Sequence, residues 1–192
     1  MKDNYILTAE SVTAGHPDKL CDTIADSILD TCLKEDPNAR VACEVLATAG
    51  KILVAGELRT TASPDVEAIV RQVVRNSGYD CNYHVEVRLH TQSPDIAGAV
   101  DGDTLGAGDQ GIMYGYACWE TVELLPAPVV LANRITSLLT TCREEKLISG
   151  IGPDGKAQVS VQYAFGVPER VDTIVISCQH DADKDPDELR EE

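Results

Sequence analysis

One segment near the start of the chain places a carboxylate, a glycine, an imidazole, a second carboxylate and an ammonium group just before an amphipathic helix. It spans residues 10–19 and reads ESVTAGHPDK. A helix N-terminus attracts anions through its unpaired N–H groups and partial positive charge. His16 and Lys19 can donate hydrogen bonds to phosphate oxygens, and Asp18 can hold a magnesium ion. The spacing is consistent with a site for ATP phosphates and magnesium, or with an ordinary helix cap that has His16 in its turn.

Two glutamates lie in otherwise apolar segments that we interpret as strands. Glu44 belongs to the segment VACEVL, and Glu57 follows ILVAG. Burying a carboxylate among apolar neighbours is costly unless it is paired or binds a cation. The alternative is that each glutamate faces water on the outer side of a hairpin, and for either residue alone this is the more common arrangement.

Two glycine-containing segments could contact a ligand. Residues 92–111 are rich in Gly, Asp and Ala and lack periodicity. Glycine lets a loop approach a ligand and move, and long irregular loops are often lids. No Walker lysine follows, so the segment is not a P-loop and is either a lid or a surface connection. In the segment PDGK, Asp154-Gly155 is a turn signal. Lys156 either reaches a phosphate or is an exposed turn lysine.

The composition restricts the classes of partner. The chain has 192 residues, of which 32 are acidic and 16 basic, so its net charge is −16. Such a surface repels nucleic acid and anionic membranes, and we expect neither as a partner. A nucleotide site on it needs metal ions and a few well-placed cations. Seven scattered cysteines without a C-x-x-C pair, and the lack of a signal peptide, predict a cytoplasmic protein.

Hydrophobic periodicity predicts an α+β fold with mostly antiparallel sheets covered by helices. Helical spacing of apolar residues recurs in three segments, at 19–34, 63–78 and 128–146. Strands are expected at 5–8, 40–48, 51–58, 82–91, 112–119, 158–165 and 170–178. A turn is expected at 150–155, and the acidic tail after residue 181 is consistent with the start of another helix.

Taken together and in order, these motifs resemble one family. They are TAESVTAGHPDK at 8–19, ACE at 42–44, GE at 56–57, QSPDI at 92–96, GAGDQG at 106–111, DGK at 154–156 and SCQH at 177–180. The chain resembles S-adenosylmethionine synthetase (methionine adenosyltransferase) over essentially its whole length. The combination of GHPDK and GAGDQG in this order is highly specific.

The resemblance implies an enzyme in which the sulfur of L-methionine attacks C5′ of ATP, and the released triphosphate is then cleaved. It implies that His16 and Lys156 are catalytic residues and that both bind ATP. Asp154 and Gly155 would line the ATP site beside them, and Asp18 would bind Mg²⁺. Because the leaving group gathers negative charge, catalysis would depend on placing cations and orienting sulfur against carbon.

The same resemblance implies a methionine site and a potassium site. Glu57, Gln92 and Asp109 would bind methionine, and Glu44 would bind K⁺. Residues 92–111 would be the flexible active-site loop. The family is homo-oligomeric, as a dimer or tetramer.

Family members are longer than this chain, which lacks their glycine-rich GGGxFSxKD loop. We therefore expect an N-terminal fragment without the third domain. Residues 1–12 plus 112–192 would form an N-terminal-type α+β domain, and 13–91 an incomplete central-type domain. The alternative is a catalytically incomplete subunit that binds a partner chain and lends half of a shared site.

Overall fold

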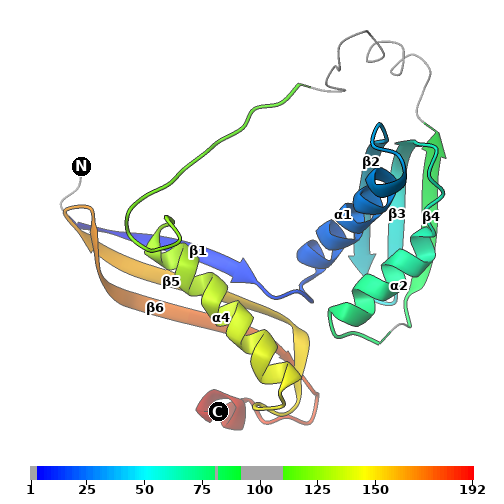
Figure 1. Ribbon diagram of the computed structural model, residues 1–192. Helices are drawn as coiled ribbons and strands as arrows, with labels where there is room; N and C mark the ends of the chain where they lie inside the picture. Colours follow the sequence, from blue (N-terminus) through cyan, green and yellow to red (C-terminus); the bar gives the residue numbers. More distant parts are fainter. Residues whose placement is uncertain (1–3, 81, 92–109) are drawn as a thin grey trace. The chain divides into compact units, whose positions relative to one another are not determined.

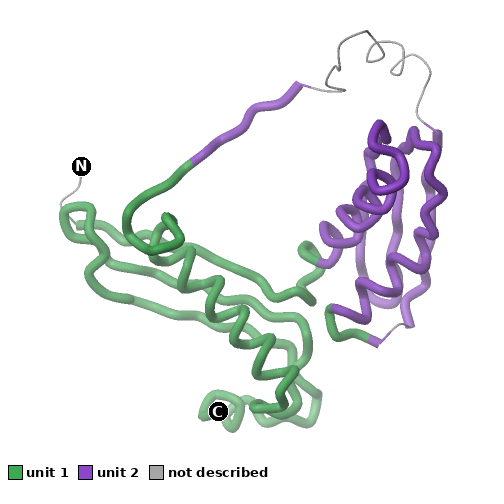
Figure 2. The backbone as a smooth tube through the Cα atoms, viewed as in Figure 1, with its two compact units in different colours: residues 1–19, 77–79, 116–192 green, residues 20–76, 80–115 purple. Residues whose placement is uncertain are grey.

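Figure 1 shows the computed structural model of the chain, which describes residues 4–80, 82–91 and 110–192. The chain divides into two compact units, coloured in Figure 2. Unit 1 contains residues 1–19, 77–79 and 116–192, and unit 2 contains residues 20–76 and 80–115. Because unit 1 combines the first strand of the chain with residues 116–192, it is discontinuous in sequence. The assignment of N-terminal-type and central-type domains to particular ranges stays a prediction.

Unit 1 is a three-stranded antiparallel sheet with one long helix on one face (Figure 1). Its strands are β1 (Asn4–Val12), β5 (Ile151–Ala164) and β6 (Val167–His180), in the order β1-β5-β6. The helix α4 (Ala127–Glu144) contacts β1 and β5. β5, the central strand, therefore pairs on both edges and is covered on one face.

The alternation of side chains along β5 separates an apolar face from a polar one. Val159, Val161 and Tyr163 are buried in a cluster with Ala132 of α4. Because successive side chains of a strand point to opposite faces, the residues between them face away from α4. Lys156 lies on that second face, next to the buried Ala157.

A buried tyrosine and a glutamate secure the beginning of α4. The hydroxyl of Tyr163 donates to Oε2 of Glu120 at 2.5 Å, and the same oxygen accepts the N–H of Ala127 at 2.9 Å. The ring of Tyr5 stacks on Tyr163 with 4.9 Å between centroids. Burial and the hydrogen bond to Glu120 raise the pKa of Tyr163 well above its ordinary range, so the phenol stays a donor.

Unit 2 is a second three-stranded sheet with helices on one face (Figure 1). It contains most of α1 (Pro17–Glu35), followed by β2 (Arg40–Thr48), β3 (Lys51–Arg59), α2 (Val66–Asn76) and β4 (His84–Thr91). β2 and β3 are antiparallel, whereas β3 and β4 are parallel. The crossover through α2 makes the parallel pairing possible.

Apolar stripes on the two helices and on β3 form the core of unit 2. In α1 the buried residues recur at helical spacing, and α2 contributes a valine stripe. These core residues are Leu20, Ile24, Ile28, Cys32, Ile52, Val54, Val66, Val70, Val73 and Val74. A carboxylate joins the end of α1 to the chain after β3, because Oδ2 of Asp36 accepts the N–H of Thr61 at 2.8 Å.

The α+β class and the predominance of antiparallel pairing are confirmed, with two corrections. The predicted strand at 112–119 is wrong, because residues 110–118 have no regular secondary structure and Ile112 is 77% exposed. The predicted turn at 150–155 is also wrong beyond its first residues. β5 already begins at Ile151, and a register shift between Ile151 and Gly155 bends the strand there.

The chain ends in the short helix α5 (Pro186–Glu191), as the acidic tail suggested. The carboxylate of Asp185 caps this helix by accepting the N–H of Asp187 at 2.8 Å. Within the described residues, no helix combines the length and the apolar character needed to cross a bilayer.

We predict that Tyr163→Phe lowers the free energy of unfolding of the chain by about 1–3 kcal/mol, because it removes a hydrogen bond to a carboxylate in a partly buried site. Urea unfolding followed by circular dichroism measures the change. Tyr5→Phe is the matched control: Tyr5 is 36% exposed, and the same deletion there should change stability by less than about 0.5 kcal/mol. Equal effects of the two substitutions would contradict the role given to Tyr163.

Candidate functional site

The end of β1 is tied to the beginning of β5 by one threonine. The N–H of Thr13 donates to the carbonyl oxygen of Gly155 at 2.9 Å. Its hydroxyl lies 2.7 Å from the carbonyl oxygen of Pro153 and 3.2 Å from that of Gly155. Thr13 is only 5% exposed. These bonds place the turn at 13–16 directly against residues 153–155.

The contact between the two segments requires a glycine. A Cβ added to Gly15 would lie 2.5 Å from the carbonyl oxygen of Pro153, closer than real Cβ atoms approach. On its other side, the carbonyl of Gly15 accepts the hydroxyl of Tyr79 at 2.6 Å. The N–H of His16 donates to the carbonyl of Thr13 at 3.1 Å. His16 is therefore the last residue of a tight turn that is held by Pro153 on one side and by Tyr79 on the other.

A groove of about 310 Å³ lies next to this contact, within unit 1. Its lining residues are His16, Asp154, Gly155, Lys156, Ser177, Cys178 and Gln179. The structure thus brings together all four residues that were predicted to bind ATP.

Three lining residues, Ser177, Cys178 and Gln179, were not predicted as site residues, although the sequence motif at 177–180 contains all three. Ser177 reaches the groove because it pairs with Lys156 across β5 and β6. Gln179 reaches it from the same strand, and its Oε1 accepts the N–H of Asp154 at 3.2 Å. The register of β6 could not be read from the sequence, so the only signal for these three residues was the motif.

Lys156 and His16 can supply the donors that a phosphate needs. Nζ of Lys156 lies 2.9 Å from Oε1 of Glu10, and both side chains are more than 40% exposed. Such a half-exposed ion pair is weak, and an ammonium group has further donors for a phosphate. Nδ1 of His16 accepts the N–H of Asp18 at 3.3 Å. A neutral imidazole in this arrangement carries its proton on Nε2, which is then a donor.

The other two polar residues of the GHPDK motif, Asp18 and Lys19, differ in whether their charged groups are exposed or already bonded within the chain. Asp18 is 90% exposed, and its Oδ2 lies 3.9 Å from Nδ1 of His16. Lys19 donates from Nζ to the carbonyl oxygen of Val12 at 2.7 Å. The predicted phosphate donor Lys19 thus contacts the end of β1, whereas the carboxylate of Asp18 faces solvent beside His16.

Glu44 and Glu57 lie in unit 2, on one face of its sheet. Glu44 pairs with Ala55, and Glu57 pairs with Ala42, so the two carboxylates are diagonal neighbours. Glu44 is exposed and Glu57 is half-buried. This is the face opposite the buried Val54, as the water-facing alternative expected.

A third carboxylate on this face is already paired. Glu86 forms ion pairs with Lys51 and with Arg88, the latter at 2.8 Å. Hydrogen bonds from Lys51 and Arg88 lower the pKa of Glu86 to about 2. The remaining predicted site residues, Gln92 and Asp109, and the loop at 92–111 up to residue 109, lie outside the described residues.

The expected cations require oxygen donors that the described residues supply only in part. The described part of the chain contains no cluster of three or more metal-binding side chains. Mg²⁺ is usually held by one or two carboxylates together with waters and substrate phosphates. The exposed carboxylate of Asp18 fits that mode of binding. Glu44 is an exposed oxygen donor on a strand, consistent with a cation ligand.

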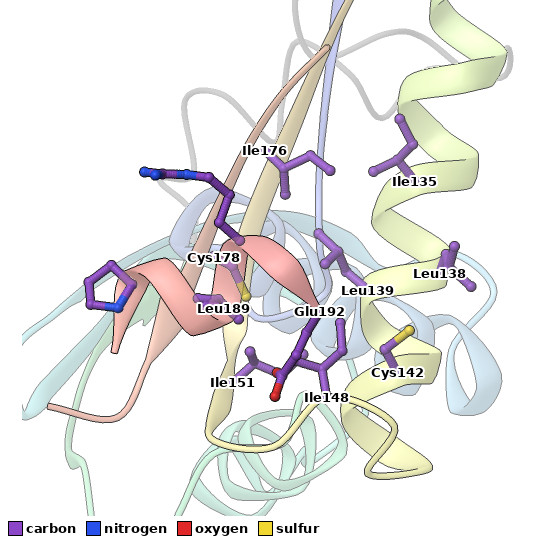
Figure 3. A pocket seen from close by; sticks show the side chains of 12 residues that line it. Ile135, Leu138, Leu139, Cys142, Ile148, Ile151, Ile176, Cys178, Leu189 and Glu192 are labelled. Atoms are coloured by element: carbon purple, nitrogen blue, oxygen red, sulfur yellow. The ribbon is translucent and has the colours of Figure 1, made fainter. Parts of the chain in front are cut away.

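A larger cavity of about 590 Å³ lies in the same unit between α4, β6 and α5 (Figure 3). The figure shows apolar side chains gathered around it, among them Ile135 and Leu139 of α4, Ile176 of β6 and Leu189 of α5. A lining of this kind offers few groups to a polyanion. The smaller polar groove beside His16 is therefore the candidate site.

Comparison with known families identifies the family of the chain. Residues 4–102 match the model of the S-adenosylmethionine synthetase N-terminal domain, and residues 104–192 match that of its central domain. The chain belongs to the S-adenosylmethionine synthetase family. The two family models divide the sequence linearly, whereas in the structure β1, from the first match, pairs with β5, from the second.

Curated relatives carry the name S-adenosylmethionine synthase. The protein of a Nitratiruptor species is 48% identical over an alignment of 201 positions that covers 100% of this chain and 52% of the relative. That of a Sulfurovum species is 50% identical over 94% of this chain and 49% of the relative. That of Prochlorococcus marinus is 47% identical over 98% of this chain and 50% of the relative. The chain thus spans about half the length of these synthases.

We predict that Glu86→Gln makes the unfolding of the chain less sensitive to acid. A carboxyl with a lowered pKa stabilises the fold fully above its ordinary pKa of 4.5, and this contribution is lost as the pH falls to about 2. The wild-type urea midpoint should therefore fall more steeply between pH 4.5 and 2 than that of the variant. Glu35→Gln, at the exposed end of α1, should keep the wild-type slope. Parallel curves for all three proteins would refute the interaction.

Proposed function

We propose that the chain provides the N-terminal part of a methionine adenosyltransferase. This enzyme would form S-adenosylmethionine from ATP and L-methionine and cleave the released triphosphate. The main support is the groove of unit 1, where His16 and Lys156 lie together with Asp154 and Gly155 in a chain that matches the family along its length.

In the proposed reaction a carbon–sulfur bond forms and the C5′–oxygen bond of ATP breaks. The methionine sulfur supplies the electron pair of the new bond and becomes a sulfonium, and the pair of the broken bond leaves with the triphosphate. His16 would donate a hydrogen bond from Nε2 to the departing oxygen. Lys156 would place its positive charge beside the same phosphates. Both contributions grow as negative charge develops, which is the requirement for lowering the barrier.

The expected cations would complete the charge balance. Asp18 would hold Mg²⁺ beside His16, and Glu44 would hold K⁺. Bound Mg²⁺ supplies neutralisation of triphosphate charge, which a protein with a net charge of −16 needs more than most.

Methionine would bind through acidic and polar side chains. The carboxylate of Glu57 would pair with the ammonium group of the amino acid, and Gln92 and Asp109 would add further hydrogen bonds. The loop at 92–111 would act as the lid over the bound substrates. A cytoplasmic homo-oligomer, dimeric or tetrameric, is the corresponding assembly.

A second candidate follows from the length of the chain. Because it spans about half of its relatives, it could instead be a catalytically incomplete subunit that lends half of a shared site to a partner chain. Mixing the chain with a full-length enzyme whose own His16 equivalent is inactivated distinguishes the two. Restored activity supports the subunit role, and unchanged inactivity opposes it.

We predict that Lys156→Met weakens binding of a non-hydrolysable ATP analogue about tenfold in the presence of magnesium, because one charge-assisted hydrogen bond is lost. Isothermal titration of the 192-residue chain measures the affinity. Lys34→Met, in the last turn of α1, removes the same charge elsewhere and should leave affinity within about twofold. Wild-type binding that is equally strong without magnesium would contradict the proposed site.

His16→Asn should behave differently from Lys156→Met in the same titration. If His16 acts mainly in the transition state, its loss should change analogue affinity less than about threefold, while slowing single turnovers of a full-length enzyme at least about a hundredfold. An unchanged single-turnover rate would remove His16 from the catalytic residues.

We also predict that the isolated chain, with ATP, methionine, magnesium and potassium, forms little or no S-adenosylmethionine. The reason is that it lacks the glycine-rich GGGxFSxKD loop expected in the family. A discontinuous assay of the product by mass spectrometry provides the measurement. Turnover on the order of 1 per second or faster, as in ordinary enzymes, would show that the chain is sufficient by itself.

A further inference from the structure

We propose that Thr13 is a positioning residue that sets the separation between His16 and Lys156 across the groove. The arrangement concerns the fold of unit 1 and stands on its own geometry. That this arrangement serves a triphosphate rests on the proposed function.

Thr13 contacts both segments that carry the site residues. On one side its carbonyl accepts the N–H of His16 at 3.1 Å. On the other, its N–H donates to the carbonyl of Gly155 at 2.9 Å, and its hydroxyl bonds the carbonyl of Pro153 at 2.7 Å. A single residue therefore connects the turn that carries His16 with the strand that carries Lys156.

The hydroxyl is well placed to hold Pro153. Because Thr13 is 5% exposed, water competes little for its hydrogen bond. Without the hydroxyl, the carbonyl of Pro153 would lose this donor in a partly buried site, which is unfavourable. The chain at Pro153 would then turn outward for another partner. Asp154, the next residue, lines the groove, so that part of the groove would move with Pro153.

Two neighbouring contacts make the position of Pro153 sensitive to such a change. Gly15 packs so closely on Pro153 that a Cβ would reach within 2.5 Å of its carbonyl oxygen. The hydroxyl of Tyr79 donates to the carbonyl of Gly15 at 2.6 Å, and the N–H of Asp154 donates to Oε1 of Gln179 at 3.2 Å. Thr13 is the residue of this set that spans both segments with its side chain and its backbone.

Thr13 acts through other residues, because it is not among those that line the groove. Its hydroxyl is directed to backbone carbonyls of residues 153 and 155. Substitution should therefore change affinity for a polyphosphate by displacing His16 from Lys156. A displacement of about 1 Å is enough to matter for charge-assisted hydrogen bonds, whose donor–acceptor distances vary over only a few tenths of an ångström.

The test compares Thr13→Val, which keeps the shape and removes the hydroxyl, with Thr13→Ser, which keeps the hydroxyl. Isothermal titration with magnesium tripolyphosphate should show affinity about tenfold weaker for valine and within about twofold of wild type for serine. Thr136→Val is the matched control, since Thr136 is also a buried threonine of unit 1, bonded to Asn133 and Ser11. It should lower stability without changing the affinity.

A second readout needs no ligand. In wild type and in Thr13→Ser, nuclear Overhauser contacts should join the α-protons of Gly15 to Pro153, and in Thr13→Val they should be weakened or lost. Thr13→Ala replaces the valine variant if valine prevents folding. Wild-type contacts and wild-type affinity in the variant without a hydroxyl would overturn the proposal.

The two readouts separate this proposal from the proposed function. If the wild-type chain binds no tripolyphosphate but the Overhauser contacts depend on the hydroxyl as expected, the positioning role stands and the phosphate site fails. If the wild type binds tripolyphosphate and Thr13→Val keeps both the wild-type affinity and the wild-type Overhauser contacts, the phosphate site stands and the positioning role fails.

Discussion

The candidate site depends on the antiparallel pairing of β1 with β5. Thr13 and Pro153 are 140 residues apart in sequence, yet the register that ends with Val12 opposite Lys156 brings them into hydrogen-bond contact. Val159 and Val161 of β5, buried with Ala132 of α4, stabilise that register, because a slip of one residue would turn the apolar face outward. The position of Lys156 relative to His16 is thus a consequence of core packing.

The net charge of the chain explains why the exact placement of a few donors in the groove beside His16 matters for the proposed function. With a net charge of −16, the surface as a whole repels a triphosphate. The groove opposes that repulsion with a few donors, and even there Glu10 neutralises part of the charge of Lys156. The exposed Asp18 adds a further negative charge next to His16. In the proposed function, a divalent cation at Asp18 would therefore be needed to make this set of residues attractive to a polyphosphate.

The grouping of His16, Asp154, Gly155 and Lys156 was expected from the resemblance to the family, because residue types alone left 154–156 equally consistent with a plain turn. Thr13 was missed as a positioning residue, because a threonine acquires that role only when a distant strand presents carbonyls to its hydroxyl. The segment at 112–119 is rich in apolar and aromatic residues, as many strands are, but it has no partner strand among the described residues. The parallel pairing of β3 with β4 depends on how α2 crosses the sheet, which periodicity does not encode.

The proposed function requires that His16 and Lys156 belong to one polyphosphate site. Nuclear magnetic resonance titration of the ¹⁵N-labelled chain with a magnesium-bound ATP analogue tests this requirement at both residues in one experiment. We expect the signals of His16, Gly155, Lys156 and Ser177 to shift together and to saturate with one dissociation constant. Shifts in which His16 and Lys156 respond with different affinities, or in which neither responds, would contradict a shared site.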